Sequence, residues 1–281
     1  MTNKNTSVQL TDMEPSASGL EIIDIHTHIY PDNIARKAAD SVKAFYEGIG
    51  DPSMDGTEGM LLDRGRKAGI DRYVVLPVAI RPDRVKSIND YIYQRAQENS
   101  SLIPFGTVHA AMDNLTDEVD RLIHMGVKGI KMHPDSQRFS IDDPRLFPMY
   151  EALAGRLPVM LHMGDPRYDY SHPLRLRRLL DLFPNLDVIA AHLGGYSMHE
   201  TAREVLYDTN CVMDISSSVV FLEPGIPEKY INLYGAERIA FGSDYPMFDP
   251  VQEVEHFLQF KLTDDQKEQI AHKTAKRILR L

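Results

Sequence analysis

Short apolar runs alternate with longer amphipathic stretches from residue 20 to the end of this chain. The short runs are rich in Val, Ile and Leu and are mostly apolar, which is typical of strands covered by helices. A rhythm of this kind predicts β-α units built around a parallel sheet. The expected strands cover residues 22–26, 72–77, 103–109, 127–133, 158–162, 188–192, 212–215 and 238–242.

The amphipathic stretches predict helices between these strands. They lie near residues 57–69, 84–98, 116–125, 144–155, 173–182, 198–207, 226–234 and 251–259, and a last helix covers about 264–279. Thr263 precedes the last helix, and Gln266 lies three residues after Thr263, which is the pattern of a capping box. Eight units without a linker favour one closed (β/α)8 TIM-like barrel over residues 20–281, rather than a doubly wound open sheet.

Composition narrows the class of protein. The 281 residues carry a formal net charge of −10, which argues against a nucleic-acid or anionic-membrane partner. No apolar run approaches the roughly 18 residues of a membrane span. Cys211 is the single cysteine, and no signal peptide is evident, so a cytoplasmic location is expected. Residues 1–19 are polar and without a period, and we expect a flexible N-terminal extension there.

Polar side chains follow five of the expected strands, each at the point where the apolar run ends. In a β/α barrel, the carboxyl ends of the strands form the catalytic face. We therefore expect these side chains to converge on one mouth of the barrel. They are His26 and His28, Lys131 and His133, His162 and Asp165, His192, and Asp244.

The pair His26 and His28 has a spacing that suits a shared ligand site. Residues two apart in a strand point to the same side, so both imidazoles can face the barrel axis. Neutral imidazole binds zinc and other borderline metals. One His-x-His pair alone is weak evidence, but with His162, His192 and Asp244 at other strand ends it predicts a divalent metal site.

Asp244 and His192 are the candidate catalytic residues. A carboxylate beside a metal can both coordinate it and accept a proton from bound water. The alternative for Asp244 is a turn or helix-capping residue. His192 precedes Gly194 and Gly195, whose missing side chains would leave room for a substrate. A metal ligand and a structural histidine are the alternatives for His192.

Other polar groups at this mouth are candidates for contact with a small-molecule substrate. Lys131 could be carboxylated to bridge two metals, pair with a carboxylate, or bind a substrate anion. The substrate-binding candidates on the loops are His133, Asp165, Arg167 and Tyr168.

Five motifs occur in order along the chain: Asp24-x-His26-x-His28, Gly129-Ile-Lys131 with His133-Pro134, His162 with Gly164-Asp165, Ala191-His192-x-Gly-Gly195, and Gly242-Ser243-Asp244-Tyr-Pro246. As an ordered set, these motifs resemble the amidohydrolase superfamily from about residue 20 to 281. The most similar branch is the amidohydrolase-related (amidohydrolase 2) group that includes aminocarboxymuconate-semialdehyde decarboxylase. One departure lies in the last helix, where family members often carry Asn-Ala-x-Arg and this chain has Thr274-Ala275-Lys276-Arg277.

The resemblance implies a deformed barrel with a divalent metal at its mouth. It assigns His26, His28, His162 and Asp244 as the ligands, and it places His192 to orient or polarise the reacting group. This branch commonly uses one metal, so Lys131 is not expected to bridge two. Zinc is the first expectation for the metal and manganese the second.

These inferences predict a metal-dependent hydrolase that acts on a small amide, ester or lactone through metal-activated water. Asp244 would take the proton and deliver it to the leaving group, while His192 polarises the carbonyl. The first alternative is a metal-dependent non-oxidative decarboxylase, a lyase, of a small carboxylic acid. The second is a metal-binding protein without catalysis. A homo-oligomer is left open.

Overall fold

The computed structural model describes residues 19–281, so the expected extension lies, except for Gly19, outside the described residues. Nine strands pair in parallel, in the orders β1-β2-β3 and β4-β5-β6-β7-β8-β9. The strands are β1 (Ile23–Thr27), β2 (Arg72–Val75), β3 (Leu102–Pro104), β4 (Gly106–Thr107), β5 (Ile130–Met132), β6 (Val159–Leu161), β7 (Val188–Ala190), β8 (Val212–Asp214) and β9 (Ile239–Ala240).

Backbone hydrogen bonds join the two sheets into a ring. Phe105 alone separates β3 from β4, and its N–H donates to the carbonyl of Val75 on β2 at 3.2 Å. At the other seam, the N–H of Ile25 on β1 donates to the carbonyl of Phe241, just after β9, at 3.0 Å. Counting β3 and β4 as one strand gives the eight expected positions, and the (β/α)8 architecture is confirmed.

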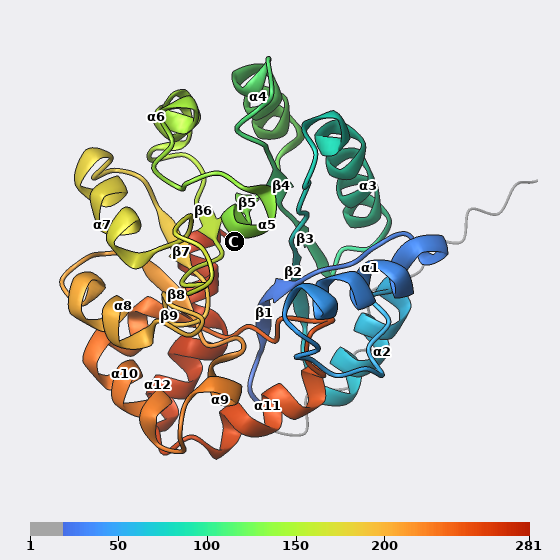
Figure 1. Ribbon diagram of the computed structural model, residues 1–281. Helices are drawn as coiled ribbons and strands as arrows, with labels where there is room; N and C mark the ends of the chain where they lie inside the picture. Colours follow the sequence, from blue (N-terminus) through green and yellow to red (C-terminus); the bar gives the residue numbers. More distant parts are fainter. Residues whose placement is uncertain (1–18) are drawn as a thin grey trace, which may run out of the picture.

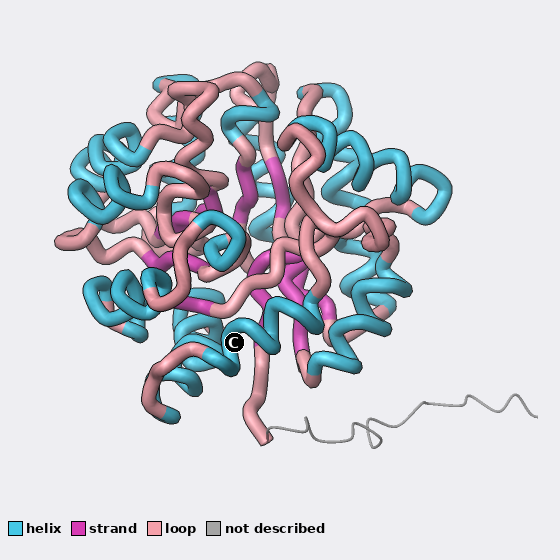
Figure 2. Tube along the Cα trace, turned by 60° about the horizontal axis from the view of Figure 1, so that its bottom comes forward, coloured by secondary structure: helices cyan, strands magenta, loops and turns pink. Residues whose placement is uncertain are grey.

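Helices surround the strands in Figure 1, and Figure 2 shows the strands enclosed within the helical layer. Within the described chain, no helix is long and apolar enough to cross a membrane. A π-helical turn, Gln269–Lys273, joins the last two helices. The α-helices are α1 (Asp32–Phe45), α2 (Glu58–Ala68), α3 (Val85–Glu98), α4 (Leu115–Met125), α5 (Pro134–Gln137), α6 (Phe147–Leu153), α7 (Pro173–Leu182), α8 (His199–Leu206), α9 (Ser218–Phe221), α10 (Ile226–Tyr234), α11 (Pro250–Gln259), α12 (Asp264–Glu268) and α13 (Thr274–Leu279).

Helix α1 is the largest difference from the sequence-based expectation, which left residues 29–56 without a helix. Two physical reasons explain the omission. The N-cap is Pro31, which has no side-chain oxygen to signal a helix start. The helix buries the small residues Ala35 and Ala39, and these give a weaker apolar period than leucine or valine. The expected capping box at Thr263 is confirmed.

The core has two layers. An outer layer fills the space between the strands and the surrounding helices. The inner layer fills the barrel itself and includes Ile25, Met160 and Ile189, together with Ile278 and Leu279 of α13. The last helix therefore contributes to the filling of the barrel. Thr274, which stands where the family that the motifs resemble often has asparagine, donates its hydroxyl to the carbonyl of Glu237 at 3.2 Å.

Candidate metal centre

A β-bulge in β1 turns the two strand-one histidines into the barrel. The register of β1 against β2 shifts between Asp24 and Thr27. Ile25 belongs to the inner core, so unbroken alternation would point Thr27 inward next. The shift reverses the alternation, and His26 and His28 line the cavity instead.

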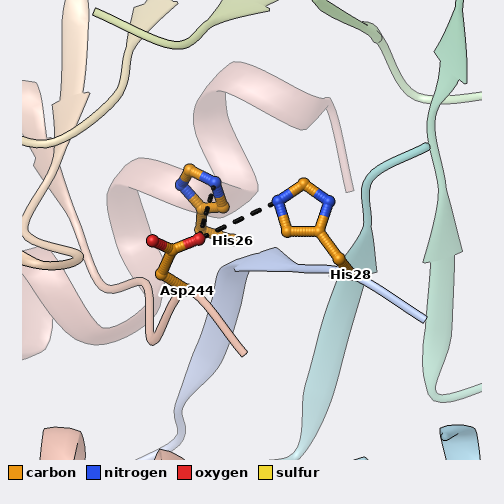
Figure 3. Close-up of side chains that lie close together, drawn as sticks. All are labelled: His26, His28 and Asp244. Atoms are coloured by element: carbon orange, nitrogen blue, oxygen red, sulfur yellow. Dashed lines mark ion pairs between the residues drawn. The ribbon is translucent and has the colours of Figure 1, made fainter. Parts of the chain in front are cut away.

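His26 and His28 present their Nε2 atoms to Asp244 (Figure 3). The Nδ1–H of His26 donates to Oδ2 of Asp214 at 2.9 Å, and the Nδ1–H of His28 donates to the carbonyl of Leu76 at 2.6 Å. These bonds fix the tautomers and leave both Nε2 atoms as acceptors. They lie 3.4 and 3.9 Å from Oδ1 of Asp244.

The protonation states of these groups suit metal binding. Burial lowers the pKa of His26 well below its ordinary value and lowers that of His28 to about 3, so both are neutral at pH 7. Burial raises the pKa of Asp244 to about 7, and a bound cation would lower it again. Ser217 donates its hydroxyl to Oδ2 of Asp244 at 2.7 Å. Two neutral imidazoles and one carboxylate fit a divalent metal.

His162, the fourth expected ligand, lies beside this trio. Its Nδ1 is 3.1 Å from Nε2 of His192, and its Nε2 is 3.2 Å from the hydroxyl of Tyr46. His162 belongs to a different group of possible metal ligands, together with His133 and Asp135. One ligand atom from each of these three residues lies within 4.8 Å of the other two. His26, His28 and Asp244 form a group of their own under the same limit, so ligation by His162 stays a prediction.

His192 is held in place from two sides. Its backbone N–H donates to Oδ1 of Asp214 at 3.0 Å, and its Nδ1 lies 2.9 Å from the hydroxyl of Ser216. The ring stacks on His26 with centroids 5.0 Å apart. His192 and Asp244 both have positive φ, 59° and 61°, which is uncommon for residues other than glycine. Such conformations persist where the surroundings over-determine them, often at functional sites.

The glycines after His192 have a different role from the one expected. In the described structure, neither Gly194 nor Gly195 is among the residues that line the cavity. A Cβ at Gly195 would meet the backbone of Met198 at 2.9 Å. Gly195 therefore permits a close approach of backbone segments, and Gly194 has a positive φ of 78° that glycine adopts without strain.

Lys131 points into the same centre. Its side chain is 1 % exposed, and Nζ lies 3.2 Å from Nε2 of His26. Burial lowers the pKa of this ammonium group to about 8, so it is still mainly charged at pH 7. The position allows it to attract an anion that binds beside His26.

A cavity of about 670 Å3 opens above these groups. Helix α1 forms part of its wall through Ala38, Val42 and Phe45. The other apolar residues that line it are Ile34 of the same helix and Ile49, Val78, Ile80, Pro246, Met247 and Phe248. The polar residues that line it are His26, His28, Tyr30, Lys37, Ser41, Tyr46, Lys131, His133, Ser136, Arg138, His162, His192, Tyr196, Ser217 and Asp244.

Of the four expected substrate-binding residues, His133 lines the cavity. Asp165, Arg167 and Tyr168 do not line it in the part of the chain that the structure describes. Arg167 donates to Asp165 at 2.7 Å and to the carbonyl of Phe45 at 2.5 Å. These contacts tie the loop after β6 to the end of α1. Contact between the three residues and a substrate stays a prediction.

Two residues of the centre were missed by sequence reasoning. Asp214, which binds His26 and His192, ends β8 at the carboxyl side, so the rule that selected the other residues would have found it. Tyr46 follows α1, and its hydroxyl lies 2.6 Å from Nε2 of His133. No signal pointed to Tyr46, because its helix was not expected.

Comparisons with known proteins agree with this architecture. A family model described as amidohydrolase matches residues 23–281. An uncharacterised TIM-barrel protein from Bordetella bronchiseptica is similar, with 21 % identity, a TM-score of 0.77, and coverage of 93 % of this chain and 99 % of that one. None of the curated proteins matches the sequence.

Two decarboxylases have the same fold. For 5-carboxyvanillate decarboxylase from Sphingomonas paucimobilis, identity is 17 % and the TM-score is 0.70, with 93 % and 99 % of the two chains covered. For a dihydroxybenzoic acid decarboxylase from Polaromonas sp. JS666, solved with manganese and the inhibitor 2-nitroresorcinol, identity is 14 % and the TM-score is 0.73, with 93 % and 97 % covered. At these identities the likeness concerns the fold.

Proposed function

Because this chain belongs to the amidohydrolase family, we propose that it is a metal-dependent decarboxylase of a small carboxylic acid. One observation carries the proposal: Asp244 is the only acidic side chain lining the cavity among the described residues, and it adjoins both histidine Nε2 atoms. The buried ammonium group of Lys131 lies in the same centre. With a divalent metal and an ammonium group against a single carboxylate, the site is positive and attracts a substrate carboxylate. A neutral ester or amide would not gain this electrostatic attraction.

Decarboxylation breaks the bond between the carboxylate carbon and its neighbour. The electron pair stays on the neighbour, which takes a proton as carbon dioxide leaves. When bound, a divalent metal supplies positive charge that holds and orients the carboxylate. Asp244 can hold the proton that the substrate carbon receives, and Ser217 orients its carboxyl group. Lys131 and His192 keep the anion in place beside His26.

Hydrolysis is the second candidate. Asp244 beside both Nε2 atoms could equally take a proton from a water molecule, which was the basis of the sequence-based expectation. The decarboxylases with the same fold favour the lyase, and we therefore place it first. The manganese in one of them likewise puts manganese before zinc as the metal to test.

The decisive experiment begins with elemental analysis of the purified protein, for which we expect one divalent metal per chain. The metal-free protein is then reloaded with manganese or zinc and incubated with aromatic carboxylic acids, lactones and amides. Release of carbon dioxide from an acid supports the lyase. Hydrolysis of a lactone or amide, with every acid left intact, contradicts it. The double variant His26→Ala, His28→Ala should contain no metal.

A further inference from the structure

The short helix α5 is fixed to the barrel by Gln137, which is 3 % exposed. The side-chain amide of Gln137 donates to the carbonyls of Ala79 and Val108 at 2.9 and 2.8 Å. Its Oε1 accepts the N–H of His133 at 2.8 Å. The C-terminal end of α5 is therefore held rigidly beside the cavity, and so is the residue that follows it.

That residue, Arg138, has φ 61° and ψ 48° and caps α5 in the left-handed region. Glycine is the residue that ordinarily takes this position at a helix end, because it has no Cβ to strain. An arginine here carries a conformational cost that a glycine would avoid. Strain of this kind is tolerated where the side chain has a use.

Arg138 lines the cavity, and its guanidinium group has no ion pair or hydrogen-bond partner among residues 19–281. Two other arginines differ: Arg145 pairs with Asp143 at 2.6 Å, and Arg167 pairs with Asp165 at 2.7 Å. Five N–H donors in a fixed fork suit a carboxylate. Arg138 thus presents an unpaired guanidinium group from a backbone position that Gln137 holds in place.

The charges that line the cavity point the same way. Lys37, Lys131 and Arg138 are positive and Asp244 is negative, in a chain whose formal net charge is −10. Lys131 is 1 % exposed, while Arg138 is exposed, so positive charge lies at both the buried and the open part of the cavity. A single carboxylate beside Lys131 and the metal would leave Arg138 unpaired.

We propose that Arg138 determines substrate specificity by binding a second anionic group, so that the substrate is an acid with two anionic groups joined by an apolar body. This inference rests on the proposed function for the first carboxylate, which reacts. The second group binds at the open part of the cavity, and Arg138 acts on substrate selection without taking part in proton transfer.

Binding can be measured without turnover. Manganese-loaded protein is titrated calorimetrically with benzoate, isophthalate and terephthalate. We expect at least one dicarboxylate to bind roughly ten-fold more tightly than benzoate, since a charge-assisted bidentate contact is gained. Arg138→Gly should reduce this ratio to about two-fold and leave the Kd of benzoate unchanged. Because glycine suits the left-handed backbone, its melting temperature should be equal to or above that of the wild type.

Two controls separate the explanations. Arg145→Gln removes a paired arginine that does not line the cavity, and it should keep the wild-type ratio. Lys37→Met tests the other exposed cation. In the wild type, the proposal is overturned if benzoate binds as tightly as both dicarboxylates or if none of the three acids binds. In the variants, it is overturned if the preference for a dicarboxylate persists in Arg138→Gly or if only Lys37→Met abolishes that preference. If the wild type prefers a dicarboxylate and Arg138→Gly does not, but the protein hydrolyses a lactone or amide and leaves every acid intact, the proposed reaction is refuted and the Arg138 assignment stands.

Discussion

The phenol oxygen of Tyr46 lies 3.2 Å from Nε2 of His162. The other ring nitrogen of His162 is already 3.1 Å from His192. A metal that uses Nε2 of His162 must therefore displace Tyr46, which follows helix α1. The fourth expected ligand and the wall of the cavity are coupled through this one contact.

Replacing Tyr46 by phenylalanine should strengthen metal binding. The variant removes the hydroxyl that competes for Nε2 of His162, and a hydrogen bond contributes about 1 kcal/mol, so we expect a roughly five-fold lower Kd for manganese. Calorimetric titration of the metal-free protein measures it. Tyr196→Phe is the matched control, since the Tyr196 ring lies 5.6 Å from that of His162, with no hydrogen bond between the two described residues. An unchanged Kd would argue that His162 does not bind through Nε2.

Asp244→Asn should damage turnover far more than folding. Asparagine keeps the size and one carbonyl oxygen but cannot hold the transferable proton. Loss of a general acid or base costs on the order of 10²–10⁴ in rate. His192→Asn should retain the metal and lose activity through poorer orientation of the substrate. Kinetics and metal content, read together for both variants, distinguish these roles. Near wild-type turnover in Asp244→Asn would restrict Asp244 to binding the metal or to structure.

Asp214 should matter for the metal without touching it. Its carboxylate accepts the Nδ1–H of His26 at 2.9 Å and so orients the ligand. Loss of such a partner typically weakens metal binding by roughly 10–100-fold, which we expect for Asp214→Asn. Asp249→Asn is the control, because Asp249 is buried and pairs with Arg64 in a separate ion pair. Equal losses of affinity in both variants would indicate a general effect on folding.

His199 should make the fold sensitive to acid. Burial lowers its pKa to about 4, below the ordinary value of 6.5, so the folded state favours the neutral ring. Stability is then lost as pH falls from about 6.5 to about 4, because the unfolded chain binds the proton more tightly. The loss is at most about 3 kcal/mol. Urea unfolding of His199→Gln should show a shallower decline over this range.

The contribution of His256 to folding stability should depend on pH in the opposite direction to that of His199. Its hydrogen bond with Glu253 raises its pKa, so its contribution to stability is present at low pH and is lost as pH rises through that value. His256→Gln should therefore lower stability near pH 5.5 more than near pH 8. A decline for His199→Gln as steep as that of the wild type would refute the role of His199.

The strand positions could be predicted because a barrel strand must bury its side chains on both faces. The helices expected at 173–182 and 226–234 coincide with α7 and α10 for a related reason, since each has a clear apolar period. The rule that selects polar residues at strand ends would also have identified Asp214. Its position at the end of β8 is the one that selected Asp244 and His162.

The orientation of the strand-one histidines was predicted correctly, but its cause was not. Simple alternation from Ile25 would have placed Thr27 inside and His26 outside. The register shift that reverses this depends on pairing with β2, a contact between distant segments that no local pattern encodes. Tyr46 was unpredictable in a similar way, because its position follows from where α1 packs.

Helix α1 has one further consequence, for the engineering of this protein. Ile34, Ala38, Ser41, Val42 and Phe45 line the cavity from one face of this helix, and none of them is a candidate ligand. This part of the surface that would contact the substrate thus lies on a segment of the chain separate from the candidate ligands and catalytic residues. A combinatorial library confined to these five positions could redirect selectivity while leaving the reactive apparatus intact.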